Sequence, residues 1–168
     1  MFEMKHVSYS CIMIKKRPIY EKKEDRKRQA KAMAELVDYL HSVSVTKQKT
    51  INTIEAPLLC PFDYEMTFKD KFWALVEVKC RTNKQDEYDN YMIGASKVQA
   101  LVHAAKSRKL ASYLLVSWAD KVGVADAVDV LEQSETGWGG RHDRNDPADT
   151  EDVLHVPYSL FTIIKNIN

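Results

Sequence analysis

Two charged residues, Glu77 and Lys79, interrupt the carboxyl end of the strongly apolar stretch Phe72–Cys80. Its apolar and β-branched residues are typical of a buried strand. Side chains of a strand alternate between its two faces, so Glu77 and Lys79 are expected on one face, together with Trp73 and Leu75. A carboxylate and an ammonium group are costly to bury unless other interactions replace their hydration. A metal ion bound by the carboxylate, and an anionic substrate held by the lysine, would do so.

Two more acidic residues, Asp63 and Glu65, lie in the preceding strand candidate, Leu59–Phe68. A charged turn separates this candidate from Phe72–Cys80, so the two are expected to form an antiparallel hairpin. Asp63 and Glu65 share one face of their strand, and the hairpin would bring one of them alongside Glu77. Two carboxylates on neighbouring strands suit Mg²⁺, which binds few protein atoms and keeps several waters. The pattern therefore indicates a magnesium site at the end of the hairpin.

Two amphipathic helices are expected to flank these strands in the sequence. Tyr20–His41 is the clearer one, and its first half is dense in Lys and Arg. Its apolar face is predicted from Ala30, Met33, Ala34, Val37 and Leu40. Tyr91–Lys109 is the second helix, with a buried arc of Ala95, Val98, Leu101, Val102 and Ala105. Lys97 borders that arc on one side, and Gln99 lies on the other.

The remaining segments suggest further strands around the hairpin. Strand candidates are Val7–Ile14, Thr50–Ala56, Ala111–Trp118, Val124–Val130 and Val153–Ile164. Pro157 indicates an edge or a break in the last of these. A glycine-rich, charged loop is expected over Gly137–Pro147. No internal repeat or linker is evident, so residues 1–168 are expected to form one domain.

Composition and charge narrow the class of protein. The apolar fraction, 45%, is that of a globular protein, and no apolar run is long enough to span a membrane. Three unpaired cysteines and the lack of a signal peptide predict a cytoplasmic protein. Residues 1–110 carry 21 Lys and Arg against 14 Asp and Glu, whereas residues 111–168 carry 4 against 10. This asymmetry suggests a basic face for a polyanion such as nucleic acid, the alternative being ordinary solvated surface.

The order helix, three strands, helix, strand resembles that of the PD-(D/E)xK nuclease superfamily. The residues that carry the resemblance are Asp63 and, fourteen positions later, Glu77-Val78-Lys79, with Glu35 and Lys97 on the flanking helices. The resemblance implies an α/β (α+β) fold with a restriction-endonuclease-like αβββαβ core, in which helices flank a central mixed sheet. Phe62 separates the proline from the aspartate of this signature, which leaves Glu65 as the fallback for Asp63.

Within the superfamily, the runs 76–82, 91–97 and 139–144 resemble those of small phage-encoded proteins. The function implied is a metal-dependent deoxyribonuclease, an endonuclease rather than an exonuclease, acting in the host cytoplasm. Its partner would be DNA, without a membrane, and cutting of both strands would favour a homodimer.

The resemblance also implies a role for each candidate residue. Asp63, Glu77 and the backbone carbonyl of Val78 would hold Mg²⁺ or Mn²⁺. Lys79 would orient or deprotonate the attacking water, or stabilise the charge of the transition state. The outer candidates are Glu35 for a second metal through water, Lys97 and more weakly Gln99 for the scissile phosphate, and Arg81 for a backbone phosphate.

Each role has a structural alternative. Glu77 and Lys79 are also compatible with a simple ion pair, Asp63 with a turn cap, and Glu35 and Lys97 with solvated helix positions. Two other functions fit the same pattern. One is a DNA-binding accessory protein on a nuclease fold that does not cut, and the other is a phage protein that binds a host factor.

Overall fold

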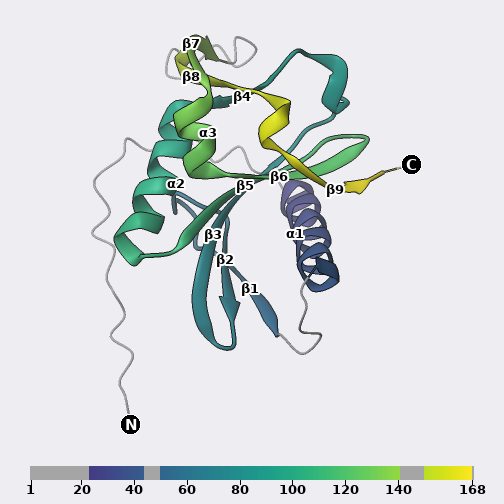
Figure 1. Ribbon diagram of the computed structural model, residues 1–168, viewed down its shortest axis with the longest axis vertical. Helices are drawn as coiled ribbons and strands as arrows, with labels where there is room; N and C mark the ends of the chain where they lie inside the picture. The colour runs from purple at the N-terminus through teal and green to yellow at the C-terminus, as the bar shows by residue number, and fades with distance from the viewer. Residues whose placement is uncertain (1–22, 44–49, 141–149, 168) are drawn as a thin grey trace.

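The computed structural model describes residues 23–43, 50–140 and 150–167 (Figure 1). The helices are α1 (Lys23–Val43), α2 (Ala95–Arg108) and α3 (Ala127–Gln133), and short 3-10 turns are η1 (Gln85–Glu87) and η3 (Tyr158–Leu160). The strands are β1 (Ile51–Glu55), β2 (Tyr64–Phe68), β3 (Lys71–Cys80), β4 (Tyr91–Gly94), β5 (Ala111–Ser117), β6 (Lys121–Asp126), β7 (Glu135–Gly140), β8 (Thr150–Val156) and β9 (Thr162–Asn166). The predicted strand at Val7–Ile14 lies outside the described residues.

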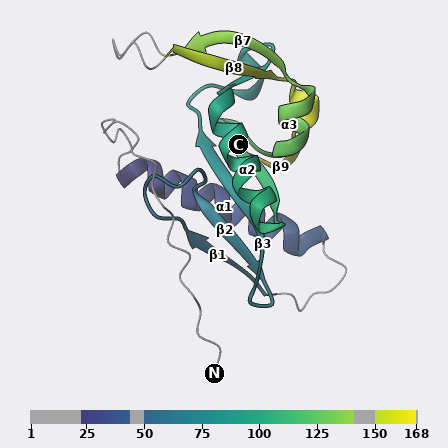
Figure 2. The same cartoon turned by 90° about the vertical axis from the view of Figure 1, so that its left-hand side faces the viewer.

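The larger sheet has the strand order β1-β2-β3-β5-β6-β9. β3 and β5 pair in parallel, and the other neighbours pair antiparallel. The chain passes from β3 to β5 through β4 and α2, because parallel strands require a long crossover. A smaller antiparallel sheet, β4-β8-β7, lies beyond one end of the larger one (Figures 1 and 2). The mixed sheet and its flanking helices confirm the predicted fold class.

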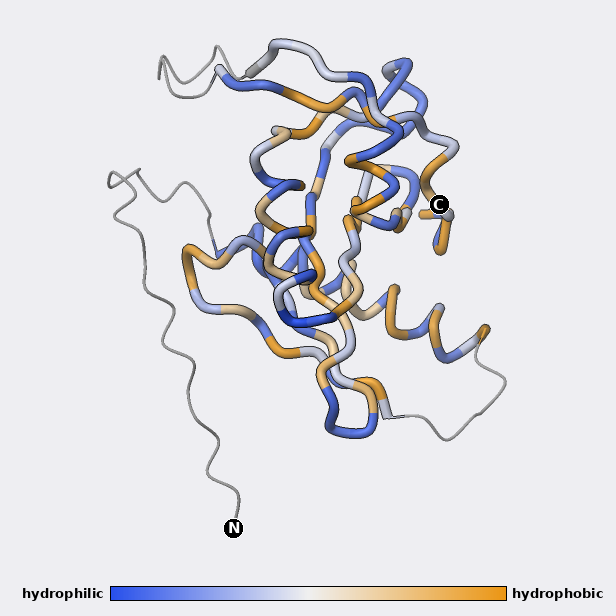
Figure 3. Tube along the Cα trace, turned by 60° about the vertical axis from the view of Figure 1, so that its left-hand side comes forward, coloured by the Kyte–Doolittle hydropathy of each residue, from blue (hydrophilic) through white to orange (hydrophobic). Residues whose placement is uncertain are grey.

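Strand β3 is buried on both faces of the larger sheet. On one face, Val76 packs in a core with Met33 of α1, and on the other face Leu75 packs in a core with Leu101 of α2. Burial on both faces explains the nearly continuous apolar sequence of this strand. The charged turn that joins β2 to β3 lies far from these cores and is hydrophilic (Figure 3).

A β-bulge changes the face of one residue that the alternation predicts. Met66 of β2 pairs with Ala74, but Thr67 pairs with Phe72, so Trp73 is the extra residue on β3. Trp73 therefore packs on the α1 side of the sheet, where its ring lies 5.9 Å from that of Tyr113. The prediction that Trp73 shares a face with Glu77 is wrong.

Helix α1 has a buried face slightly different from the predicted one. Its buried residues are Ala32, Met33 and Leu36, whereas Ala30 and Ala34 are exposed. The predicted face runs through the small alanines and leaves out the larger Leu36, which lies on the same face as Met33. The prediction is right for Val37 and Leu40, which pack at the edge of this core.

Helix α2 begins later than predicted, because Tyr91–Gly94 form strand β4 and pair with β8. The predicted buried arc from Ala95 to Ala105 is confirmed. Gly94 joins strand to helix where β8 approaches closely: a Cβ at this position would lie 2.4 Å from Oε1 of Glu151. The sequence does not reveal this pairing, since β8 follows β4 by more than fifty residues.

Two other segments differ from prediction. The strand expected over Val124–Val130 ends at Asp126, whose carboxylate accepts hydrogen bonds from the backbone N–H groups of Val128 (2.8 Å) and Asp129 (3.4 Å) and so caps α3. The first part of the loop predicted over Gly137–Pro147 belongs to β7, and residues 141–149 lie outside the described part. Pro157 does break the last segment, between β8 and η3.

Candidate active site

Asp63 is held against the centre of the larger sheet by the backbone of β3. Its N–H donates to the carbonyl of Val76 (2.9 Å), and its Oδ2 accepts from the N–H of Val78 (2.7 Å). These two bonds flank Glu77, so the Asp63 carboxylate is fixed beside the Glu77 segment of the neighbouring strand. The predicted hairpin therefore brings these two acids to one end of β2 and β3.

Glu77 and Lys79 form an ion pair on β3, in which Lys79 Nζ donates to Glu77 Oε1. The Glu77 side chain is 6% exposed and that of Lys79 is 28% exposed. Burial opposes the charge of the ammonium group, but attraction to Glu77 and Asp63 outweighs it. The pKa of Lys79 is therefore raised above its ordinary value. Lys79 is protonated at neutral pH in this arrangement.

Tyr91, which was not among the predicted site residues, adds a buried phenol to this cluster. Its hydroxyl accepts a hydrogen bond from Arg81 (3.1 Å), and the Arg81 guanidinium lies 5.1 Å from the centre of its ring. Burial raises the pKa of the Tyr91 hydroxyl, with opposing contributions from Arg81 and Lys79. The electrostatic coupling to Lys79 and Glu77 places Tyr91 beside the ion pair.

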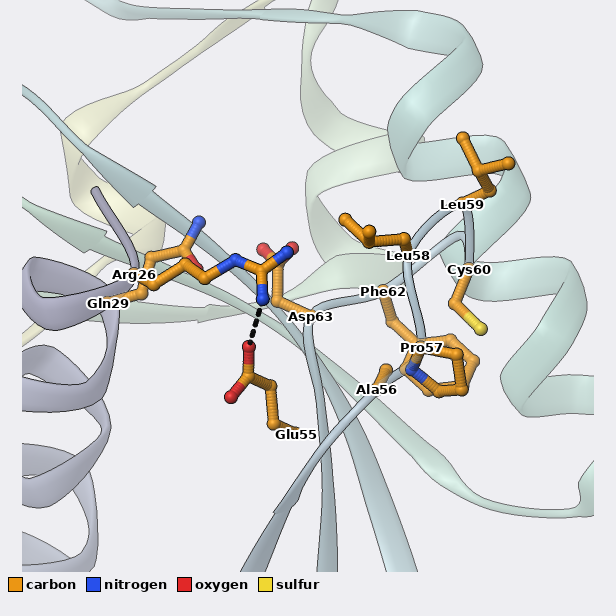
Figure 4. Close-up of a pocket in the computed structure, with 10 residues that line it drawn as sticks. All are labelled: Arg26, Gln29, Glu55, Ala56, Pro57, Leu58, Leu59, Cys60, Phe62 and Asp63. Atoms are coloured by element: carbon orange, nitrogen blue, oxygen red, sulfur yellow. Dashed lines mark ion pairs between the residues drawn. The ribbon is translucent and has the colours of Figure 1, made fainter. Parts of the chain in front are cut away.

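The first part of α1 approaches Asp63 from the other side. Arg26 and Gln29 point toward Asp63 in a small cavity of about 60 Å³, and Arg26 forms an ion pair with Glu55 (3.5 Å, Figure 4). Arg26 is one of the basic residues in the first half of this helix. Its position beside Asp63 makes it a candidate contact for a substrate phosphate.

The other predicted residues lie at varying distances from this centre. Glu65 forms an ion pair with Arg108 of α2, and Glu35 forms one with Lys165 of β9 (3.5 Å). Lys97 and Gln99 are exposed on the surface of α2. The structure thus brings together Asp63, Glu77, Lys79 and Arg81, and it gives Glu65 and Glu35 partners elsewhere.

A basic cavity of about 560 Å³ opens between α1, the segment after β3 and β9. Arg28, Lys31, Arg81 and Lys165 line it, with Glu35 as the one acid among its lining residues in the described chain. Arg28 donates to the carbonyl of Arg81 (3.0 Å), which connects the cavity wall to the end of β3. Four cations against one carboxylate make this cavity a candidate path for a nucleic-acid backbone.

The donor set fits a magnesium site with few protein ligands. Within residues 23–43, 50–140 and 150–167, no group of three or more His, Cys, Asp or Glu side chains is arranged around a common metal position. The two carboxylates of Asp63 and Glu77 match the small number of protein ligands that Mg²⁺ needs.

Comparison with protein families gives a match over residues 15–164, to a family described as "Phage putative PDDEXK endonuclease". The chain belongs to this family. It is therefore a phage-encoded DNA endonuclease, as the predicted superfamily and function implied. A comparison with curated proteins gave no match.

One solved nuclease shares the fold of this PD-(D/E)xK endonuclease, and a second was also found as a match. D212, a nuclease from a fusellovirus, is similar with a TM-score of 0.52 and 14% identity, over 88% of this chain and 91% of that one. Hjc, a Holliday junction resolvase from Archaeoglobus fulgidus, gives a TM-score of 0.49 and 13% identity, over 79% of this chain and 86% of that one. In the described part of the endonuclease, no helix is both long and apolar enough to cross a membrane.

Proposed function

We propose that this endonuclease hydrolyses DNA with a divalent metal ion, Mg²⁺ or Mn²⁺, held by Asp63, Glu77 and the backbone carbonyl of Val78. The observation that supports this most is the hydrogen bond from Val78 N–H to the Asp63 carboxylate, which fixes one acid beside the other. A bound ion would polarise a phosphoryl oxygen and lower the pKa of a coordinated water.

Lys79 acts as a cation and not as a base in this proposal. Its raised pKa keeps the ammonium group protonated at neutral pH, so Lys79 is suited to orient the attacking water and to stabilise developing negative charge.

The DNA backbone runs along the basic cavity in this proposal. Arg81 and Arg26 contact the phosphates nearest the acids, and Arg28, Lys31 and Lys165 contact those farther away. Lys97 and Gln99 are exposed on α2 and would reach DNA only from the outside. Glu35 would assist a second metal through water only if it left Lys165.

The test is cleavage of linear, circular and branched DNA with Mg²⁺, with Mn²⁺ and with a chelator. Wild-type protein should cut only when a divalent ion is present, and Glu77→Ala and Lys79→Ala should not cut. DNA binding without any cleavage by the wild type would instead favour an accessory protein that does not cut. No binding at moderate salt, with a host protein co-purifying, would favour a partner-binding role.

We also propose that residues 1–168 act as one nuclease-like domain in the host cytoplasm and that two copies cut opposite strands. Among the described residues, strand β9 lies at the edge of the larger sheet, and its outer side has no partner strand there and could pair with a second copy. Sedimentation of the protein with and without a short duplex would test the dimer, and a monomer under both conditions would contradict it.

A further inference from the structure

A third cavity, of about 440 Å³, lies next to the acidic centre, and its lining is mainly aromatic. It is bounded by the loop after β3, by β4 and by the segment from β8 to η3. The rings of Tyr88, Tyr91, Trp118 and Tyr158 line it, whereas basic residues dominate the cavity between α1 and β9. Aromatic walls with a few polar groups are typical of sites for planar ligands.

The inner rings of this cavity pack against one another, and the ring at its mouth is exposed. Trp118 and Tyr91 are buried and meet edge to face, with ring centres 5.8 Å apart, and Tyr158 packs on Trp118 at 6.0 Å. Tyr88, in contrast, is 62% exposed. An exposed ring at the mouth of a rigid aromatic cavity can stack on a planar group that enters.

Two hydrogen-bond donors in this lining have no partner among the described residues. The indole N–H of Trp118 is buried without one, which is costly for a polar group. The side-chain oxygen of Asn90 interacts with His155 Nδ1 (3.1 Å), and no hydrogen bond is seen from its amide nitrogen within residues 23–43, 50–140 and 150–167. Asn90 lines the cavity, so its amide nitrogen is placed to donate to a ring nitrogen or carbonyl oxygen of a nucleobase, whereas the Trp118 N–H is enclosed by the protein.

The cavity is connected to the proposed cutting site through Arg81 and Tyr91. Arg81 lines both cavities and follows Lys79 by two residues, so about 7 Å of chain separates them. Tyr91 forms part of the cavity wall and is coupled to the Glu77–Lys79 pair. A nucleotide whose phosphate is at the acidic centre would therefore have its base near Tyr88.

We propose that this aromatic cavity binds an unpaired nucleobase of the DNA substrate, next to the phosphate that is cut. The inference rests on the proposed function and specifies its substrate class: DNA with an unpaired nucleotide, and not a fully paired duplex. A paired base is held inside the helix and reaches such a cavity only after unstacking, which costs least for a base that is already unpaired.

The test measures DNA binding without divalent ions, so it does not depend on cleavage. Fluorescence anisotropy would compare a paired duplex with the same duplex carrying one unpaired 2-aminopurine. Wild-type protein should bind the second about tenfold more tightly, and the fluorescence of 2-aminopurine should change on binding as it stacks on Tyr88. Equal affinity for the two duplexes would overturn the inference.

The variants separate this cavity from the rest of the DNA interface. Tyr88→Ala should remove the tenfold preference while leaving affinity for the paired duplex unchanged, and Tyr88→Phe should keep it because the ring remains. Phe72→Ala, which removes an exposed ring at the far end of β3, serves as the matched control and should keep the preference. Loss of the preference in Phe72→Ala, or its retention in Tyr88→Ala, would contradict the assignment.

Failure of the proposed function would look different. A protein that prefers the unpaired base but never cuts DNA with Mg²⁺ or Mn²⁺ would support the cavity and refute the hydrolysis. A protein that cuts paired and unpaired substrates equally well would support the hydrolysis and refute the cavity.

Discussion

The β2–β3 hairpin carries two glutamates, Glu65 and Glu77, that each pair with a cation but have different surroundings. Glu65 on β2 pairs with Arg108, which comes from α2, and Glu77 on β3 pairs with Lys79 on its own strand. Both acids were candidates for the metal site. The Arg108 guanidinium also lies over the ring of Phe72, 5.2 Å from its centre.

The difference lies in the second acid, Asp63, that accompanies the Glu77 pair. Asp63 is fixed beside Glu77 by its bond to Val78, and the Glu77 side chain is 6% exposed, whereas that of Glu65 is 18% exposed. The Glu65 pair joins a helix to a strand, which is a structural task. The Glu77 pair gathers two acids and a lysine at a strand end, where a cation and a phosphate could be bound.

Removing the acids should separate the two pairs most strongly. Asp63→Asn should lower the rate of DNA cleavage about 10³-fold, about 4 kcal/mol of transition-state stabilisation, because the metal loses a charged ligand. Glu65→Gln should stay within a few-fold of the wild type. Single-turnover cleavage at saturating protein measures both. If the two variants lost activity equally, the assignment of Asp63 over Glu65 would fail.

Removing the cations should separate the two pairs by their effect on stability, again with the larger effect at Glu77. Lys79→Ala leaves Glu77 buried beside Asp63 without its cation, and should lower the free energy of unfolding by about 3 kcal/mol in a metal-free buffer. Arg108→Ala leaves a more exposed acid and should cost about 1 kcal/mol. Urea unfolding gives both values. Added Mg²⁺ should recover stability in Lys79→Ala and not in Arg108→Ala, and equal responses would argue against a metal at Glu77.

Metal binding should stabilise the folded protein through the acids at the Glu77 pair and not through Glu65. At ten times the dissociation constant, Mg²⁺ should add about 1.4 kcal/mol to the free energy of unfolding, about 3–6 °C in melting temperature. Glu65→Gln should show the same shift and Asp63→Asn none. Thermal unfolding with and without Mg²⁺ checks this, and a shift that persisted in Asp63→Asn would place the metal elsewhere.

The sequence predicts the hairpin and its acids well because alternation and turn signals are local. The helix assigned to Tyr91–Gly94 is wrong because pairing with β8 is a long-range interaction that periodicity does not show. The predicted face of Trp73 is wrong because a single β-bulge shifts the alternation of side chains along β3. In the candidate site, the position of Tyr91 near the ion pair and that of Arg26 beside Asp63 depend on how β4 and α1 pack against β3, which local sequence patterns do not show.

The fall in stability at alkaline pH should differ least between the two glutamate pairs, and so tests them most finely. Tyr91 lies near the Glu77–Lys79 pair and can ionise, whereas Phe72 lies against Arg108 and cannot. The buried Tyr91 has a raised pKa, so above pH 10 the unfolded chain loses this proton before the folded one does. The folded state is then disfavoured, and stability should fall with a slope of up to about 1.4 kcal/mol per pH unit from this group. Tyr91→Phe should make the decline between pH 10 and 11 shallower. Lys79, whose pKa the neighbouring acids raise, and Tyr113 and Tyr158, whose pKa values burial raises, keep their share of the decline. Phe72→Leu should leave the slope unchanged. Urea unfolding at several alkaline pH values measures it, and an unchanged slope in Tyr91→Phe would mean that this phenol is not buried beside the ion pair in solution.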